Sequence, residues 1–173
     1  IEGSATVAVK FEGIFHEFSS IPGVVEDVTE IILNLKPVNL IMADGVEEKR
    51  IYLKKNTAGK VYAKDIVTDP QVTVLNPDNL IATLDQNSNL VIEMIVRKGR
   101  GYVPAEKQVV EGESVQMIPI DSVFSPIEKV SYHIENTRVG QSTDYDLLIM
   151  EMWTNGGIAP EDAVAHAAKI VKD

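Results

Sequence analysis

Residues 38–98 consist of short apolar runs, each separated from the next by a turn sequence. The runs are VNLIMA, KRIYLKK, QVTVL, LIATL and NLVIEMIVRK, and the dividing sequences are ADGVEE, NTAGK, TDP and LNPDN. Runs of about four to eight residues that are rich in Val, Ile and Tyr and bounded by Gly, Pro, Asn or Asp are typical of strands joined by tight turns. The pattern therefore predicts a β-rich module.

A strand and a helix are expected before this module. Apolar and polar residues alternate over residues 4–12, which predicts a half-buried strand with Ala5, Val7, Val9 and Phe11 on one face. Apolar residues then recur at helical spacing from Val24 to Leu35, with acidic residues in the expected first turn and a proline after the last. The opposite face of this helix carries Asp27, Glu30 and Asn34, and residues alone favour a solvated surface there.

The chain after residue 98 alternates between polar and regular segments. Residues 99–117 are polar and Gly-containing, which predicts a long surface excursion. Strands are expected over 122–137 and 145–153, joined by RVGQSTDYD as the loop of a long hairpin. Pro160, followed by acidic and then Ala-rich sequence, predicts a last helix. Its small residues would let another helix approach closely.

Composition excludes several classes of function. The 173-residue chain has 26 acidic and 16 basic residues, a net charge of -10 that argues against broad contact with DNA phosphates. It has no cysteine, and its histidines at 16, 133 and 166 lack metal-ligand spacing, so we expect no disulfide and no zinc site. No apolar run is long enough to span a bilayer, which predicts a soluble protein.

The residue types of a catalytic site are present, but nothing in the sequence indicates that they come together in space. Ser142 and Asp144 with His133 or His166 would supply a hydroxyl, an acid and an imidazole, but no nucleophile-elbow sequence surrounds the serine. RKGRGYVP, residues 97–104, has two glycines among cations yet lacks phosphate-loop spacing, so a structural turn or interface loop is favoured. The adjacent carboxylates at 26–27 and 47–48 are expected to be solvated.

Three long strings carry a family resemblance. They are HEFSSIPGVVEDVTEIILNLK (16–36), RKGRGYVPAE (97–106) and the continuous sequence 118–170, from IPIDSVFSPIEKV to PEDAVAHAAKI. In this order and spacing, they resemble the N-terminal assembly domain of the alpha subunit of bacterial DNA-directed RNA polymerase. The resemblance covers nearly the whole chain.

The resemblance implies an α+β fold with a split architecture. Residues 3–125 would form a β-rich insert subdomain that contacts the beta subunit, and 126–173 would form the C-terminal part of a dimerisation subdomain of antiparallel sheet and helices. The family's first strand and first helix are expected to precede Ile1 and to be missing here. Ala159 stands where the family usually has a Thr that caps the last helix.

The resemblance also implies a role and partners. The chain would be a non-catalytic scaffold that dimerises with a second alpha and binds beta and beta-prime in support of transcription in the bacterial cytoplasm, with no cofactor, metal, membrane or direct nucleic-acid contact. An unrelated β-rich protein-binding module is the alternative, and a hydrolytic enzyme comes third. Whether the acidic loop 109–116 meets an activator stays open.

Site residues follow from the resemblance by position. The implied beta contacts are His16, Asp27, Glu30 and Asn34. The implied beta-prime contacts are Lys36, Ile120 and Ile127. Further interface residues are Arg97, Arg100 and Tyr102, and the implied dimerisation residues are Val164, Ala168 and Val171. We expect Glu30→Ala to weaken binding of beta with little loss of stability.

Overall fold

The computed structural model describes residues 1–14, 19–108 and 116–173, and for residues 142–144 it describes the backbone alone. The described residues form two compact units, Glu2–Ser125 and Pro126–Asp173, and Ile1 groups with the second. His16 and nearly all of loop 109–116 lie outside the described residues.

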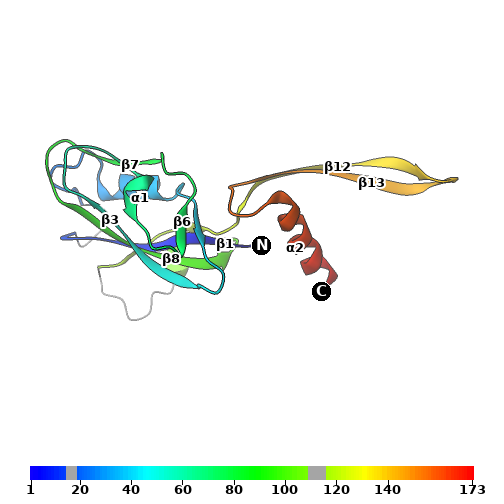
Figure 1. Ribbon diagram of the computed structural model, residues 1–173, viewed down its shortest axis with the longest axis horizontal. Coiled ribbons are helices and arrows are strands. Elements are labelled where there is room, and N and C mark those ends of the chain that lie inside the picture. Colours follow the sequence, from blue (N-terminus) through cyan, green and yellow to red (C-terminus); the bar gives the residue numbers. More distant parts are fainter. Residues whose placement is uncertain (15–18, 109–115) are drawn as a thin grey trace. The chain divides into compact units, whose positions relative to one another are not determined.

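The Glu2–Ser125 unit is built on a five-stranded antiparallel sheet (Figure 1). Its central strand β8 (Leu90–Arg100) pairs with β1 (Glu2–Phe11) on one side and β3 (Glu48–Lys55) on the other. The edge strands are β10 (Ile118–Pro119) beside β1 and β5 (Ile66–Val67) beside β3. Three two-stranded ladders complete the unit: β2 (Leu40–Met42) with β6 (Val72–Val74), β4 (Gly59–Tyr62) with β7 (Leu80–Leu84), and β9 (Tyr102–Val103) with β11 (Ser122–Val123).

One helix covers part of the core of this unit. Helix α1 (Val28–Leu35) buries four apolar residues at helical spacing, and they join side chains from β1, β3, β7 and β8 in one cluster. Two short 3-10 turns, η1 (Ala63–Asp65) and η2 (Ala105–Lys107), connect strands. The expected α+β fold with antiparallel sheets is confirmed.

The five predicted runs correspond to β2, β3, β6, β7 and β8. The structure adds β4, which lies partly in the NTAGK divider and is formed by pairing with β7 rather than by an apolar pattern of its own. It also adds β9, so the expected excursion over 99–117 is wrong at Tyr102–Val103. Cross-strand partners, which lie far away in sequence, decide these short strands.

Strand β1 departs from strict alternation. Val7, Ala8 and Val9 are all buried, because the register with β8 shifts between Thr6 and Ala8. This bulge turns the strand, so that Val7 and Ala8 pack with Ile95 in a second small cluster while Val9 joins the main core. A one-residue shift moves side chains to the other face of a sheet, which explains why the period-2 pattern failed here.

The Pro126–Asp173 unit contains a long hairpin and a helix. Strands β12 (Ile127–Val139) and β13 (Ser142–Thr154) pair along their full length, and Val139 lies opposite Ser142. The expected nine-residue loop is therefore wrong: the reversal takes only Gly140 and Gln141, and Gly140 has the positive φ of 62° that such tight turns favour.

Helix α2 (Pro160–Lys172) follows the hairpin and begins as the sequence indicates. Pro160 occupies its first turn, Glu161 and Asp162 add acidic side chains there, and Ala163 is buried. Ala159 is the residue that precedes the helix, and its side chain makes no capping hydrogen bond.

Gly99 makes a close contact that a larger residue could not share. A Cβ on this glycine would lie 2.9 Å from the ring of Phe124, which is 5% exposed and packs with Val7, Ala8 and Ile95. We expect Gly99→Ala to lower the free energy of unfolding by about 1–3 kcal/mol, measured by urea denaturation, because a buried ring must move. The double variant, Gly99→Ala with Phe124→Leu, should lose less stability than the sum of the losses in the two single variants. Full additivity would contradict this account.

Candidate functional site

The start of α1 is fixed by two carboxylates. The Asp27 carboxylate accepts a hydrogen bond from the Glu30 backbone N–H at 2.8 Å, and the Glu30 carboxylate accepts one from the Asp27 N–H at 3.0 Å. This reciprocal capping box starts the helix at Val28, four residues later than the apolar spacing predicted. Both side chains remain exposed at the surface. Glu30 therefore stabilises the helix, and the spacing of an Asp followed three residues later by a Glu was the available sequence signal.

The predicted contact Asn34 is also engaged within the chain. Its side-chain N–H donates to the Ile81 backbone carbonyl at 2.9 Å, and its backbone carbonyl accepts from the Asn79 side chain at 2.9 Å. Upstream, Glu26 accepts hydrogen bonds from the Thr83 backbone and hydroxyl. These bonds attach both α1 and the residues that lead into it to β7 and the residue before it. Asn34 is half-buried, so only part of it faces outward.

A groove runs beside α1, which we call the α1 groove. Leu33 is 55% exposed and borders it, whereas Ile120 is 3% exposed and presents only an edge. The volume is about 140 Å³, well below the roughly 300 Å³ at which small-molecule pockets begin, so the groove fits a single side chain of a partner better than a cofactor. Its lining residues are Thr29, Ile32, Leu33, Lys36, Ala105, Pro119, Ile120 and Asp121.

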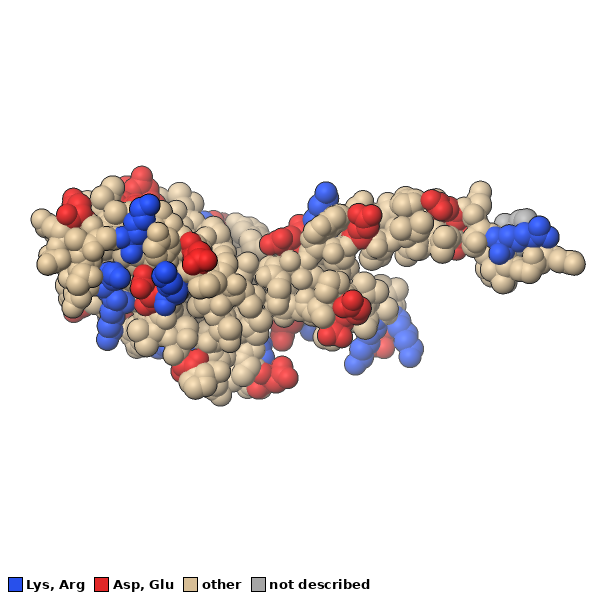
Figure 2. Space-filling model, turned by 45° about the horizontal axis from the view of Figure 1, so that its top comes forward, with Lys and Arg blue, Asp and Glu red and all other residues tan. Residues whose placement is uncertain are grey.

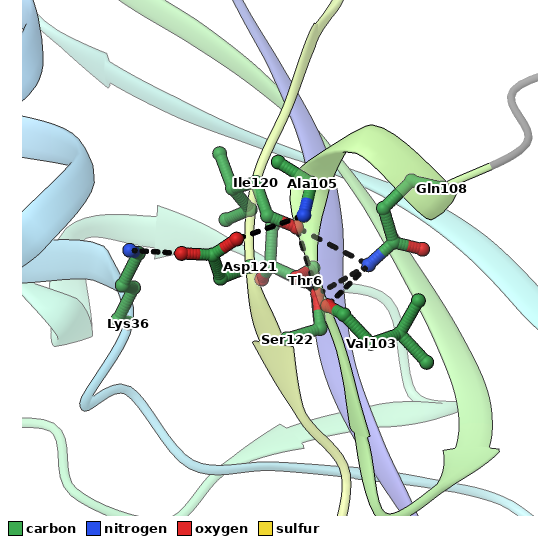
Figure 3. Close-up of polar contacts among 8 residues, drawn as sticks. All are labelled: Thr6, Lys36, Val103, Ala105, Gln108, Ile120, Asp121 and Ser122. Carbon is green, nitrogen blue, oxygen red and sulfur yellow. Dashed lines mark hydrogen bonds and ion pairs between the residues drawn. The ribbon is translucent and has the colours of Figure 1, made fainter.

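Asp121 joins three segments at one end of the groove (Figure 3). One carboxylate oxygen accepts the Ala105 backbone N–H at 2.8 Å, and the other lies 3.3 Å from Lys36 Nζ. The Tyr102 phenol lies close enough to this carboxylate for the two groups to shift each other's pKa. The structure thus brings Lys36, Tyr102 and Ile120 together around a residue that the sequence pattern did not single out. A lone acid in the apolar stretch IPIDSV was the available signal.

The charge on Asp121 is favoured by these donors. The Ala105 N–H, then Lys36 and Tyr102, lower the pKa of its carboxyl below the ordinary value. The pKa of the Tyr102 phenol is raised, first by partial desolvation and then by the charges of Asp121 and Glu106. Because the folded-state pKa of Asp121 is lowered, its stabilisation is present above the ordinary carboxyl pKa and is lost as the pH falls through the folded-state value.

Ser122, the next residue, faces the opposite way and is buried (Figure 3). Its hydroxyl donates to the Thr6 carbonyl of β1 at 2.6 Å, and it accepts from the Gln108 side chain at 2.9 Å. The Gln108 amide also donates to the Ile120 carbonyl at 3.2 Å. Adjacent residues of an extended chain point to opposite sides. Asp121 therefore attaches this segment to the end of α1 and to η2, and Ser122 attaches it to strand β1 of the sheet.

The remaining residues predicted at 97–102 have different surroundings. Arg97 is half-buried on the face of the sheet opposite the main core, with its Nε 2.6 Å from a Glu48 carboxylate oxygen. Arg100 is exposed at the end of β8. Gly101 turns the chain into β9 with a φ of 65°, and η2 follows with three residues. Within the described part of this segment, the turn at Gly101 and the single turn η2 agree with the structural-turn interpretation.

Charges of both signs are mixed on the face of the Glu2–Ser125 unit seen in Figure 2. Ion pairs across neighbouring strands of this unit also bring opposite charges together: Arg50 with Glu93 at 2.7 Å, and Arg97 with Glu48. A duplex-binding surface instead gathers cations on one side. On the visible face, the cations are interspersed with acidic residues instead.

The hairpin of the second unit has one apolar face, which we call the apolar ribbon face. Directly opposed residues of an antiparallel pair project to the same side. Three consecutive such pairs on this face are wholly apolar, whereas the other face includes His133, Glu135 and Glu151. Five of the six apolar residues are at least 44% exposed. The pairs are Val130 with Met152, Tyr132 with Met150, and Ile134 with Leu148.

The predicted dimerisation residues lie exposed on α2. Val164 is 45% exposed and Val171 is 86% exposed, and Ala168 between them is also exposed. Ile127 begins β12 in this unit and is half-buried.

The catalytic interpretation with His133 as the base fails on strand register. Ser142 pairs with Val139 beside the turn, whereas His133 pairs with Ile149. Seven residues of strand, on the order of 23 Å, therefore separate the serine from the histidine. His133 instead lies 3.1 Å from Glu135 on the exposed ribbon.

Two further observations concern the part of the chain that the structure describes. Within it, no three His, Cys, Asp or Glu side chains gather as a metal site would require. No helix there combines the length and the apolar character needed to cross a membrane.

Comparison with known proteins gives one family and close relatives. Residues 9–125 match the family described as "RNA polymerase Rpb3/RpoA insert domain". The chain is 53% identical over 173 residues to the DNA-directed RNA polymerase subunit alpha of Geobacter metallireducens, covering 100% of this chain and 51% of the relative. The same-named subunits of Moorella thermoacetica and Alkaliphilus metalliredigens are 52% and 53% identical, with 99% and 100% of this chain and 54% and 55% of the relatives covered. The chain thus spans about half the length of the curated relatives it matches.

The capping box changes what substitutions at Glu30 should do. Glu30→Ala removes the acceptor for the Asp27 N–H and should lower the free energy of unfolding by about 1 kcal/mol, measured by thermal or urea denaturation. Glu30→Gln removes the charge but keeps an acceptor in the same place, so its stability should stay close to that of the unmodified chain. Equal losses for both variants would show that the box is not what Glu30 contributes. Effects on partner binding should therefore be measured with Glu30→Gln.

Proposed function

This chain belongs to the RNA polymerase Rpb3/RpoA insert domain family, and we propose that it acts as a scaffold subunit of bacterial RNA polymerase that dimerises and nucleates assembly by binding beta and beta-prime. The observation that carries the proposal is similarity along the whole chain, 53% identity over 173 residues, to a subunit alpha of DNA-directed RNA polymerase. The nucleotidyl-transfer chemistry would belong to the assembled complex, with no catalytic residue supplied by this chain.

Dimerisation is supported by the second unit. An isolated two-stranded hairpin is marginally stable in water, and contiguous exposed apolar surface usually marks an interaction site. The apolar ribbon face and the exposed Val164, Ala168 and Val171 of α2 are two such surfaces. We propose that the α2 residues meet a second copy of the subunit and that residues 126–173 belong to the dimerisation subdomain.

Binding of the two large subunits is assigned to residues 3–125, the insert subdomain, and to Ile127. The exposed carboxylates Asp27 and Glu30, with Asn34 and His16, would contact beta. Lys36, Ile120 and Ile127 would contact beta-prime. The geometry of α1 supports this division between beta and beta-prime contacts. Glu30 and Asn34 lie on one face of the helix, whereas Leu33 and Lys36 lie on the neighbouring face, which lines the α1 groove. Tyr102 would join the groove side, and Arg97 and Arg100 would be peripheral.

Partners and location complete the proposal. The subunit would work in the bacterial cytoplasm and contact DNA only through the assembled enzyme. The mixed charges across β3 and β8 support protein rather than nucleic-acid contact.

Two exposed apolar residues of the same unit test the groove assignment. Leu33, 55% exposed, borders the α1 groove, and Val67, 61% exposed, lies on the edge strand β5. In the full-length subunit, Leu33→Asp should weaken binding of beta-prime to the alpha–beta complex by about tenfold or more, since a charge would replace an apolar contact. Val67→Asp should leave it within about twofold. Binding can be followed by biolayer interferometry on the immobilised alpha–beta complex. Equal binding by both variants would contradict the assignment.

A further inference from the structure

Ala105 lines the α1 groove and belongs to a segment, 102–108, that has only short regular elements. Its strand β9 has two residues and its turn η2 has three. Both are held by the continuous run from Asp121 to Phe124. Ser122 and Val123 pair with Val103 and Tyr102, and the Phe124 N–H donates to the Gly101 carbonyl at 2.8 Å.

Asp121 is the member of this run that reaches α1. Through Lys36 it contacts the end of the helix, and through the Ala105 N–H it holds the start of η2. Lys36, Ala105 and Asp121 all line the groove. The carboxylate therefore connects the end of α1 with the start of η2 beside the groove, while Gln108 attaches the end of η2 to Ile120 and Ser122.

A carboxylate that accepts a backbone N–H and an ammonium donor makes stronger hydrogen bonds than a neutral acceptor does. The lowered pKa of Asp121 agrees with this, because the donors favour the ionised form. Each side-chain group of this pair is about one-third exposed, so the ion pair with Lys36 by itself contributes little to overall stability. Its main effect is local order in the groove.

We infer that Asp121 is a positioning residue for partner binding: it holds η2 against the end of α1 and so presets the α1 groove for an apolar side chain of beta-prime. This inference rests on the proposed function and adds to it the residue that organises the site. A preset groove binds more tightly because less ordering remains to be done on association.

Asp69 offers a matched control. Like Asp121, it accepts a backbone N–H, from Gln71 at 2.7 Å, and pairs with a lysine, Lys49 at 3.2 Å. Its pKa is also lowered, first by the Gln71 bond. It belongs to the same unit but does not line the α1 groove. Loss of each carboxylate therefore removes similar bonds in two different places.

The experiment compares Asp121→Ala, Asp121→Asn and Asp69→Ala in the full-length subunit. The affinity of each for beta, and of each alpha–beta complex for beta-prime, is measured, together with hydrogen exchange at the Ala105 amide. We expect Asp121→Ala to weaken beta-prime binding about tenfold and to speed exchange at Ala105, with beta binding unchanged. Asp121→Asn keeps an acceptor for the Ala105 N–H and should restore part of the affinity. Asp69→Ala should bind beta-prime as the unmodified chain does.

Three other outcomes would contradict the positioning role of Asp121 or the proposed function. Unchanged beta-prime binding by Asp121→Ala, with the unmodified subunit binding normally, contradicts the positioning role. Equal weakening by Asp69→Ala, or parallel loss of beta and beta-prime binding, would show a general effect on folding and also contradict it. If the unmodified subunit binds neither large subunit, the proposed function fails and this inference fails with it.

Discussion

Strand β8 exchanges backbone hydrogen bonds with β1 along one edge and with β3 along the other. Both neighbours pair with it over most of their length. This strand therefore positions the main core on one face of the sheet, the charged pairs on the opposite face, and the turn at Gly101. β1 in turn carries β10 and accepts the Ser122 hydroxyl at Thr6. The α1 groove therefore depends on a sheet whose strands come from both ends of the unit.

Local patterns predicted the elements that carry their own signal. The apolar periodicity of α1 and the runs that became β3 and β8 are examples. The patterns failed where a distant partner or a single polar bond decides the outcome. The Asp27–Glu30 capping box starts α1 later than its apolar spacing indicates, and pairing of Val139 with Ser142 replaces an expected loop. A register shift in β1 buries Ala8, which alternation placed outside.

The candidate site shows the same division. Family resemblance, not residue chemistry, led to Lys36, Ile120 and Tyr102. The structure places Lys36 and Ile120 in the lining of the α1 groove and Tyr102 near the lining residue Asp121. Asp121 was missed because its importance lies in contacts with residues 85 and 16 positions away, to Lys36 and Ala105. In the opposite direction, Asp27 and Glu30 proved to have a structural use, so exposure and charge alone do not identify a contact residue.

The role that we propose, assembly of a larger complex, is tested by the complexes that the subunit forms. The most direct test is the mass of the complex, by native mass spectrometry, when the full-length subunit is co-expressed with beta. The account predicts one beta bound to two copies of the subunit. Separate masses for beta and for a monomeric subunit would contradict it.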